Sequence, residues 1–141
     1  KDQLHLKTYL NDWNFKKVVK GEFFNWENEF LELPIHELHG TNKLNGNKIE
    51  VLLNETENSD WKFRRDIRIS APLNSVWSVS ETGIPYLNPE IVLLYKAKNT
   101  RGKDHQDFLA IKDFLKNEQK QWLRNALDLH EPEHKWLEFL V

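Results

Sequence analysis

The stretch Gly83-Ile-Pro-Tyr-Leu-Asn-Pro-Glu-Ile-Val-Leu-Leu-Tyr-Lys-Ala-Lys98 decides how this chain is expected to fold. Residues 84–86 read as a short extended piece. Asn88 is a favoured helix N-cap residue, proline is favoured at the first helical position, and Glu90 suits the positive end of a helix. The stretch therefore predicts a change from extended structure to a helix that runs from Pro89 to about Asn99.

Short apolar alternations precede this helix and predict strands over residues 13–20, 22–26, 48–54, 61–63 and 67–69. Lys20-Gly21 is expected to join the first two as a hairpin. Residues 29–46 contain Pro34, Gly40 and Gly46 as breakers and are expected to be a loop with short ordered pieces. A short helix is expected near the N-terminus.

Helical patterns follow the decisive stretch over residues 103–115, 118–129 and 132–140, after a break at Arg101-Gly102. Residues 1–87 are thus expected to be mainly strands and loops, and residues 88–141 to be helical. Strands followed by helices indicate an α+β fold, and 141 residues suit one domain with one core.

Composition limits the classes of function. The formal net charge of −2 argues against a general binder of nucleic acid or anionic membranes, and no apolar run approaches the length of a membrane span. The chain has no Cys, so disulfides and thiolate chemistry are excluded and a cytoplasmic setting is expected. It also has no Met and begins with Lys, which leads us to expect a piece of a longer protein.

Lys96 is the first candidate for chemistry, because on a helix it flanks the apolar face formed by Val92 and Leu93. An ammonium beside a core needs a partner, which could be Asp107 or an anionic ligand such as a phosphate. The alternative is that the aliphatic part of the side chain packs on the core while the charged end reaches water. If Asp107 is the partner, its loss is expected to cost about 1–3 kcal/mol as a partly buried charge.

Asp104 and Asp107 are three residues apart on the next expected helix and so share a side. Either they serve as a helix cap and a salt bridge, or they hold Lys96 and Lys103 in place for a phosphate chain. Arg65, in a small basic pair after a strand, either meets an anionic ligand or marks a solvated strand end.

Glu50 lies in the middle of the expected strand 48–54, where a lone carboxylate is uncommon. It is either a metal ligand, which needs further oxygen donors, or a solvent-facing strand residue. The pairs His36/His39 and His130/His134 have helical spacing, but no cluster of carboxylates or Cys completes a zinc site, so metal binding by these histidines is not expected.

The decisive stretch, followed by Lys103-Asp-x-x-Asp107-Phe, resembles the C-terminal half of bacterial nucleotidyltransferases of the aminoglycoside and lincosamide adenylyltransferase-like group. The segment Ile49-Glu-Val-Leu-Leu-Asn-Glu55, the segment Trp61-x-Phe-Arg-Arg65, and the tail from Gln121 through Trp136-Leu fit the same group. The resemblance covers most of the chain and is loose before Lys48.

The resemblance implies a nucleotidyltransferase-like mixed sheet with a helical C-terminal region. It also implies transfer of a nucleoside monophosphate from ATP or another nucleoside triphosphate to a hydroxyl of a small molecule such as an aminoglycoside, with Mg²⁺. Glu50 matches the family's third metal-binding carboxylate, and Lys96 matches the lysine that meets the triphosphate. Lys103, Asp104, Asp107 and Arg65 are expected around the same nucleotide.

One departure separates the chain from that family. The family's Gly-Gly turn and the acidic pair after it are absent, and Lys1-Asp-Gln-Leu resembles the sequence just after that pair. We therefore expect an enzyme as the full-length protein and an inactive chain by itself. The alternatives are a non-catalytic nucleotide- or anion-binding module and a structural subunit of the same fold.

Overall fold

The structure is a computed structural model that describes residues 2–27 and 29–140, and its fold is α+β. The chain divides into two compact units, Lys1–Asn54 (the N-terminal unit) and Glu55–Val141 (the C-terminal unit). Each unit has its own cluster of buried side chains, whereas the sequence analysis expects one domain with one core.

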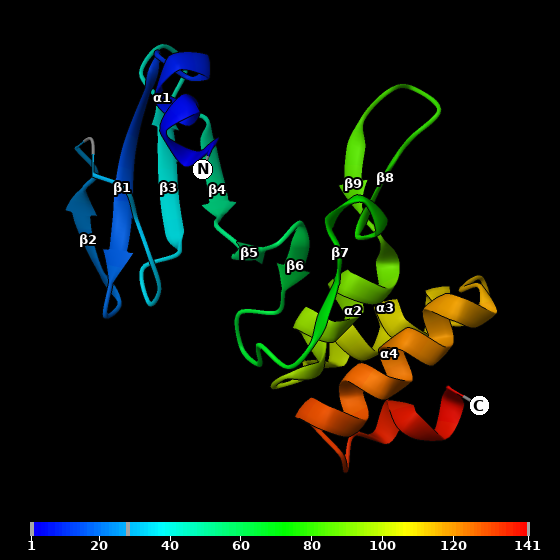
Figure 1. The fold of residues 1–141 in the computed structure, drawn as a ribbon. Helices are drawn as coiled ribbons and strands as arrows, with labels where there is room; N and C mark the ends of the chain where they lie inside the picture. The colour runs from blue at the N-terminus through cyan, green and yellow to red at the C-terminus, as the bar shows by residue number, and fades with distance from the viewer. Residues whose placement is uncertain (1, 28, 141) are drawn as a thin grey trace. The chain divides into compact units, whose positions relative to one another are not determined.

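The N-terminal unit is a small antiparallel sheet with a short helical segment (Figure 1). Its elements are η1 (Asp2–Leu4), α1 (His5–Tyr9), β1 (Trp13–Val19), β2 (Glu22–Asn25), β3 (Glu37–Asn42) and β4 (Lys48–Leu52). Figure 1 shows the four strands side by side in the order β2-β1-β3-β4. The β1–β2 turn is a two-residue hairpin in which Lys20 and Gly21 have φ angles of 53° and 83°, a backbone that matches the twist of the strands.

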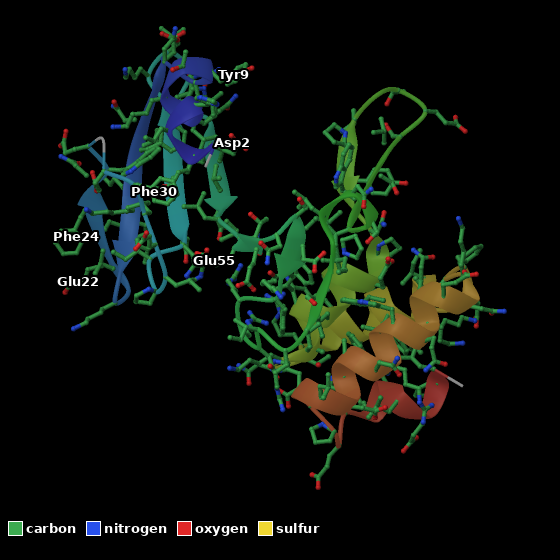
Figure 2. The ribbon with its side chains drawn as sticks, in the orientation of Figure 1. Asp2, Tyr9, Glu22, Phe24, Phe30 and Glu55 are labelled. Atoms are coloured by element: carbon green, nitrogen blue, oxygen red, sulfur yellow. The ribbon has the colours of Figure 1, made fainter. Side chains whose placement is uncertain are left out.

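One face of this sheet carries the core of the unit. Phe15, Trp26, Leu31 and Leu38 are buried there, and Leu6 of α1 packs against them. The helix supplies apolar cover on one side only, and some large side chains remain outside the core. Tyr9 on α1 and Phe24 on β2 project outward (Figure 2). The sheet therefore has one covered face and one uncovered face, and the uncovered face mixes polar side chains with exposed Phe23 and Leu52.

The C-terminal unit combines short strands with helices. Its elements are β5 (Thr56–Glu57), β6 (Asp60–Lys62), β7 (Ser70–Pro72), η2 (Leu73–Ser75), β8 (Trp77–Val79), β9 (Pro85–Leu87), α2 (Pro89–Ala97), α3 (Gly102–Ile111), α4 (Asn117–His130) and η3 (Lys135–Phe139). Strands β5, β6 and β7 form one antiparallel sheet, and β8 pairs with β9 in a separate ribbon.

Aromatic packing closes the core of this unit. Trp136 is fully buried and lies flat on Phe108 of α3, with ring centroids 4.4 Å apart and 6° between the ring planes. The indole Nε1–H of Trp136 donates a hydrogen bond to Nδ1 of His105 over 3.0 Å, so its one polar group is satisfied. The C-terminal segment is thereby fixed against α3.

Most of the expected elements are confirmed, with a few corrections. The strand expected over residues 67–69 is wrong, because Ile69 donates its N–H to the carbonyl of Asp66 in a turn and the strand begins at Ser70. Strand β3 falls within the expected loop 29–46, and β8 was not expected. Helix α3 ends at Ile111, and the last segment is a 3₁₀ helix that starts at Lys135.

Asn88 precedes α2 as expected, but its side chain does not cap the helix. Its Oδ1 accepts a hydrogen bond from Ser78 Oγ over 2.5 Å, and its Nδ2 donates to the carbonyl of Ser75 over 2.8 Å. The residue therefore fastens the β8–β9 ribbon to the start of α2.

Across residues 2–27 and 29–140, no helix is both long and apolar enough to cross a lipid bilayer.

Candidate functional site

Lys96 lies in the last turn of α2 and faces the first half of α3. The α2–α3 turn brings the two helices together: Asn99 has a φ of 57°, and Thr100 Oγ1 donates to the carbonyl of Ala97 over 2.7 Å, closing α2. The Lys96 ammonium pairs with the carboxylate of Asp107, as the sequence predicts. Its Nζ atom also lies 3.7 Å from Oδ1 of Asp104.

Asp104 is buried at the start of α3, and both of its carboxylate oxygens accept hydrogen bonds from neighbouring groups. Its Oδ2 accepts hydrogen bonds from the backbone N–H of Arg101 over 3.1 Å and from the Arg101 Nε–H over 2.6 Å, and its Oδ1 accepts from the same guanidinium over 3.0 Å. These bonds, and to a smaller extent the charge of Lys96, lower the pKa of Asp104 to about 2. The cap and the ion pair are thus the observed role of Asp104.

A cavity of about 400 Å³, the cationic cavity, opens beside the ends of α2 and α3. Four of its side chains are cationic and one is a carboxylate, with the lining Arg65, Val92, Tyr95, Lys96, Lys98, Asn99, Arg101 and Asp104. Even with the nearby carboxylate of Asp107 counted, cations outnumber anions by four to two. Such an excess favours an anionic ligand.

Arg65 is held in the wall of this cavity. Its guanidinium donates to the carbonyl of Tyr95 over 2.7 Å, and the guanidinium of Arg64 lies 4.9 Å from the Tyr95 ring centroid. Burial and then the charge of Arg64 lower the pKa of Arg65. Neither arginine pairs with a carboxylate within residues 2–27 and 29–140. The guanidinium is fixed in position, and an anion would relieve the repulsion between the two charges.

An apolar groove of about 460 Å³ lies next to the cationic cavity. Six of its eight lining residues are apolar or aromatic, and the full lining is Tyr86, Leu87, Pro89, Val92, Leu93, Lys96, Asp107 and Ile111. Val92 and Lys96 line both spaces, so the two are adjoining parts of one surface. The groove is formed by the β9 strand and the facing sides of α2 and α3.

The structure brings together most of the residues expected around a nucleotide. Arg65, Lys96, Asp104 and Asp107 lie at the cationic cavity or its edge, whereas Lys103 is exposed and lines neither space. Sequence reasoning missed the cationic role of Lys98 and Arg101 and the groove itself. The run from Lys96 to Lys103 does carry four cationic residues, and this is the sequence feature that could have indicated the cavity. Which of these side chains come together depends on the α2–α3 turn.

Glu50 belongs to a second group, in the N-terminal unit. Strand β4 places it directly opposite His39 on β3, and Glu37 lies two residues before His39 on the same face of that strand. One ligand atom from each of Glu37, His39 and Glu50 lies within 4.8 Å of the other two. Glu50 therefore has the partners that a metal ligand requires. One of them is His39, for which the sequence showed no cluster of carboxylates to complete a metal site.

The family resemblance implies Mg²⁺ at Glu50, and the donors in this group can be judged against that ion. Mg²⁺ takes oxygen ligands in a near-ideal octahedron, whereas imidazole nitrogen suits zinc and other transition metals. Two carboxylates and one imidazole do not fit Mg²⁺ well. The group at Glu50 is therefore not suited to magnesium chemistry.

Comparison with known proteins gave no relative. No family model, no curated protein and no solved structure matches this chain.

Proposed function

We propose that the C-terminal unit binds a nucleoside triphosphate, as the nucleotide-binding part of a nucleotidyltransferase-like protein. The observation that carries the proposal is the position of Lys96, whose side chain is shared by the cationic cavity and the apolar groove. A nucleotide has the matching division, because its phosphates are anionic and its base is flat and largely apolar at its faces.

The phosphates are assigned to the cationic cavity. Lys96 has three N–H donors, and the carboxylates of Asp104 and Asp107 occupy only part of that capacity. Arg65 and Lys98 add positive charge without a carboxylate partner among the residues that the structure describes. A phosphate oxygen placed here gains charge-assisted hydrogen bonds, which are stronger than bonds between neutral groups.

The base is assigned to the apolar groove. Tyr86 and Leu87 of β9 form one side of the groove, and Val92, Leu93 and Ile111 contribute from the two helices. Tyr86 and Leu87 are exposed in the chain as it stands, so a ligand in the groove would cover apolar surface. Burial of apolar surface contributes roughly 25 cal/mol per Å², and this term favours a nucleotide over free phosphate.

Transfer of the nucleotide to a small-molecule hydroxyl, in a cytoplasmic protein, is the activity that the family resemblance adds to this binding. In that reaction the acceptor oxygen bonds to the α-phosphorus as the α–β phosphoanhydride bond breaks, pyrophosphate leaves, and the hydroxyl proton passes to water. The groups at the cationic cavity would hold the triphosphate in line for this step, which is catalysis by positioning and charge stabilisation. The competing candidate is an anion-binding module, favoured by the four cationic side chains that line the cationic cavity.

Calorimetric titration with ATP tests the proposal, using wild type, Lys96→Ala and the control Lys103→Ala. Loss of a charge-assisted hydrogen bond costs about 1.5–3 kcal/mol, so Lys96→Ala should weaken ATP binding about 10- to 150-fold. Lys103→Ala removes the same charge from an exposed site outside both spaces and should change affinity by less than about twofold.

The ligand series separates the two candidates. If ATP binds more tightly than inorganic tripolyphosphate, the groove recognises the nucleoside and the proposal stands. Equal affinities would favour the anion-binding module. Absence of ATP binding, or equal weakening by Lys96→Ala and Lys103→Ala, would reject the assignment of Lys96 to the phosphates.

A further inference from the structure

The uncovered face of the N-terminal sheet carries a group of metal-ligating side chains that the proposed function does not use. Glu37 and His39 share this face of β3, and Glu50 reaches it from β4. The imidazole Nε2 of His39 lies 2.6 Å from Oε1 of Glu37, and the three ligand atoms lie within 4.8 Å of one another.

The strand register fixes this arrangement. His39 and Glu50 are cross-strand partners, so their Cβ atoms are about 4.5–5.5 Å apart by the geometry of an antiparallel pair. The ring of Phe23 on β2 packs edge-on against the imidazole, with centroids 5.0 Å apart, and holds it in place. Two ligands from one strand and a third from its neighbour therefore converge without any contribution from a mobile loop.

We propose that Glu37, His39 and Glu50 bind a divalent transition-metal ion, with Zn²⁺ as the ion that best fits the donors. Zinc takes His nitrogen and Glu oxygen at about 2.0–2.2 Å, and sites with three protein ligands keep a further position open for water or substrate oxygen. The imidazole selects against Mg²⁺ and Ca²⁺, which take oxygen donors.

The geometry requires only side-chain adjustment. Two donors on one tetrahedral zinc lie roughly 3.4 Å apart, which follows from bond lengths of about 2.1 Å. The ligand atoms now lie within 4.8 Å of one another, and rotation of the glutamate side chains would bring them closer. The side chain of Glu50 is exposed, so it has room to rotate. Lys16 lies opposite His39 on β1 and brings one ammonium group to the same face. A bound metal ion must compete with this ammonium for the carboxylates.

Titration of the full chain with Zn²⁺ followed by calorimetry tests the site, with Co²⁺ as a spectroscopic probe of the ligand set. Wild type should bind one Zn²⁺ and should give Co²⁺ visible absorption bands that indicate nitrogen and oxygen ligation. His39→Gln and Glu50→Gln should each weaken Zn²⁺ binding by about tenfold or more. The control His36→Gln changes a histidine outside the group and should bind as wild type does.

Three results would overturn the proposal. One is Zn²⁺ affinity that is the same in wild type and His39→Gln, which would place the ion on other histidines. Another is Mg²⁺ binding as tight as Zn²⁺ and insensitive to His39→Gln, which would indicate an oxygen-only site. The third is no saturable Zn²⁺ binding at millimolar metal, which would leave Glu37 and His39 as an ion pair only. ATP binding is measured without zinc, so it can fail or succeed independently.

Discussion

Lys96 on α2 and Asp107 on α3 form an ion pair in which the carboxylate side chain is 54% exposed. An exposed pair contributes little, so Asp107→Ala should cost about 0.2–1 kcal/mol in urea unfolding, below the 1–3 kcal/mol expected from the sequence. Asp113→Ala, which removes an exposed carboxylate paired with Lys112, is the matched control. A loss for Asp107→Ala well above that of the control would show that the pair is shielded from water.

The ion pair also affects the proposed ligand. Asp107→Ala removes a negative charge beside the cationic cavity and frees Lys96, so ATP should bind at least as tightly as it does to wild type. Calorimetry on the variant measures this. Weaker ATP binding would mean that Asp107 is needed to aim the ammonium at the phosphates.

Asp104 should make the stability of the C-terminal unit depend on pH in strongly acidic solution. Its pKa falls from an ordinary value of 3.8 to about 2 in the folded chain, so the unfolded chain binds the proton more readily. Its contribution is therefore complete above about pH 4 and is lost as pH falls toward 2.

Urea unfolding of wild type and Asp104→Asn across pH 2–6 checks the sign. The stability difference between the two should be constant at the upper end of this range and should shrink as pH approaches 2. A difference that grows on acidification would contradict the ion pair with Arg101 as the cause of the lowered pKa.

Gly40 should be intolerant of a side chain. A Cβ added there would lie 2.7 Å from Cε1 of Phe15 and 2.8 Å from Cγ2 of Ile49. Overpacking of this kind costs about 1–3 kcal/mol, so Gly40→Ala should lower the urea midpoint of the N-terminal unit. Gly102→Ala meets no atom within 4 Å and should be neutral or stabilising. Equal stability of the two variants would show that Phe15 or Ile49 moves aside without cost.

Local sequence patterns predicted much of the fold. The alternation of apolar residues over residues 48–54 predicted β4, and the sequence Asn-Pro-Glu predicted the start of α2. Both predictions were possible because strand periodicity and helix-end preferences are local properties. The Lys96–Asp107 contact was also accessible, since one turn between two amphipathic helices brings their facing sides together.

Properties that depend on pairing between distant residues were not accessible in the same way. Metal binding by His39 was not expected, because no cluster of carboxylates was visible around it in the sequence. The residue lies in β3, a strand within the stretch that contains the breakers Pro34, Gly40 and Gly46. Its position opposite Glu50 depends on the register of β3 and β4, which no local pattern specifies. The apolar groove likewise requires residues of β9 and α3 to line one space, although the whole of α2 separates the two elements in the sequence.

The most direct test of nucleotide binding at Lys96 is an ATP titration followed by ¹H–¹⁵N NMR on the full chain. If ATP binds at Lys96, the largest shifts should occur at Arg65, at residues 95–101 and at the groove residues Tyr86 and Leu87. At a subsaturating ATP concentration, Lys96→Ala should strongly reduce these shifts, and Lys103→Ala should leave them unchanged. Shifts confined to the N-terminal unit, or absent from the α2–α3 turn, would rule out nucleotide binding at Lys96.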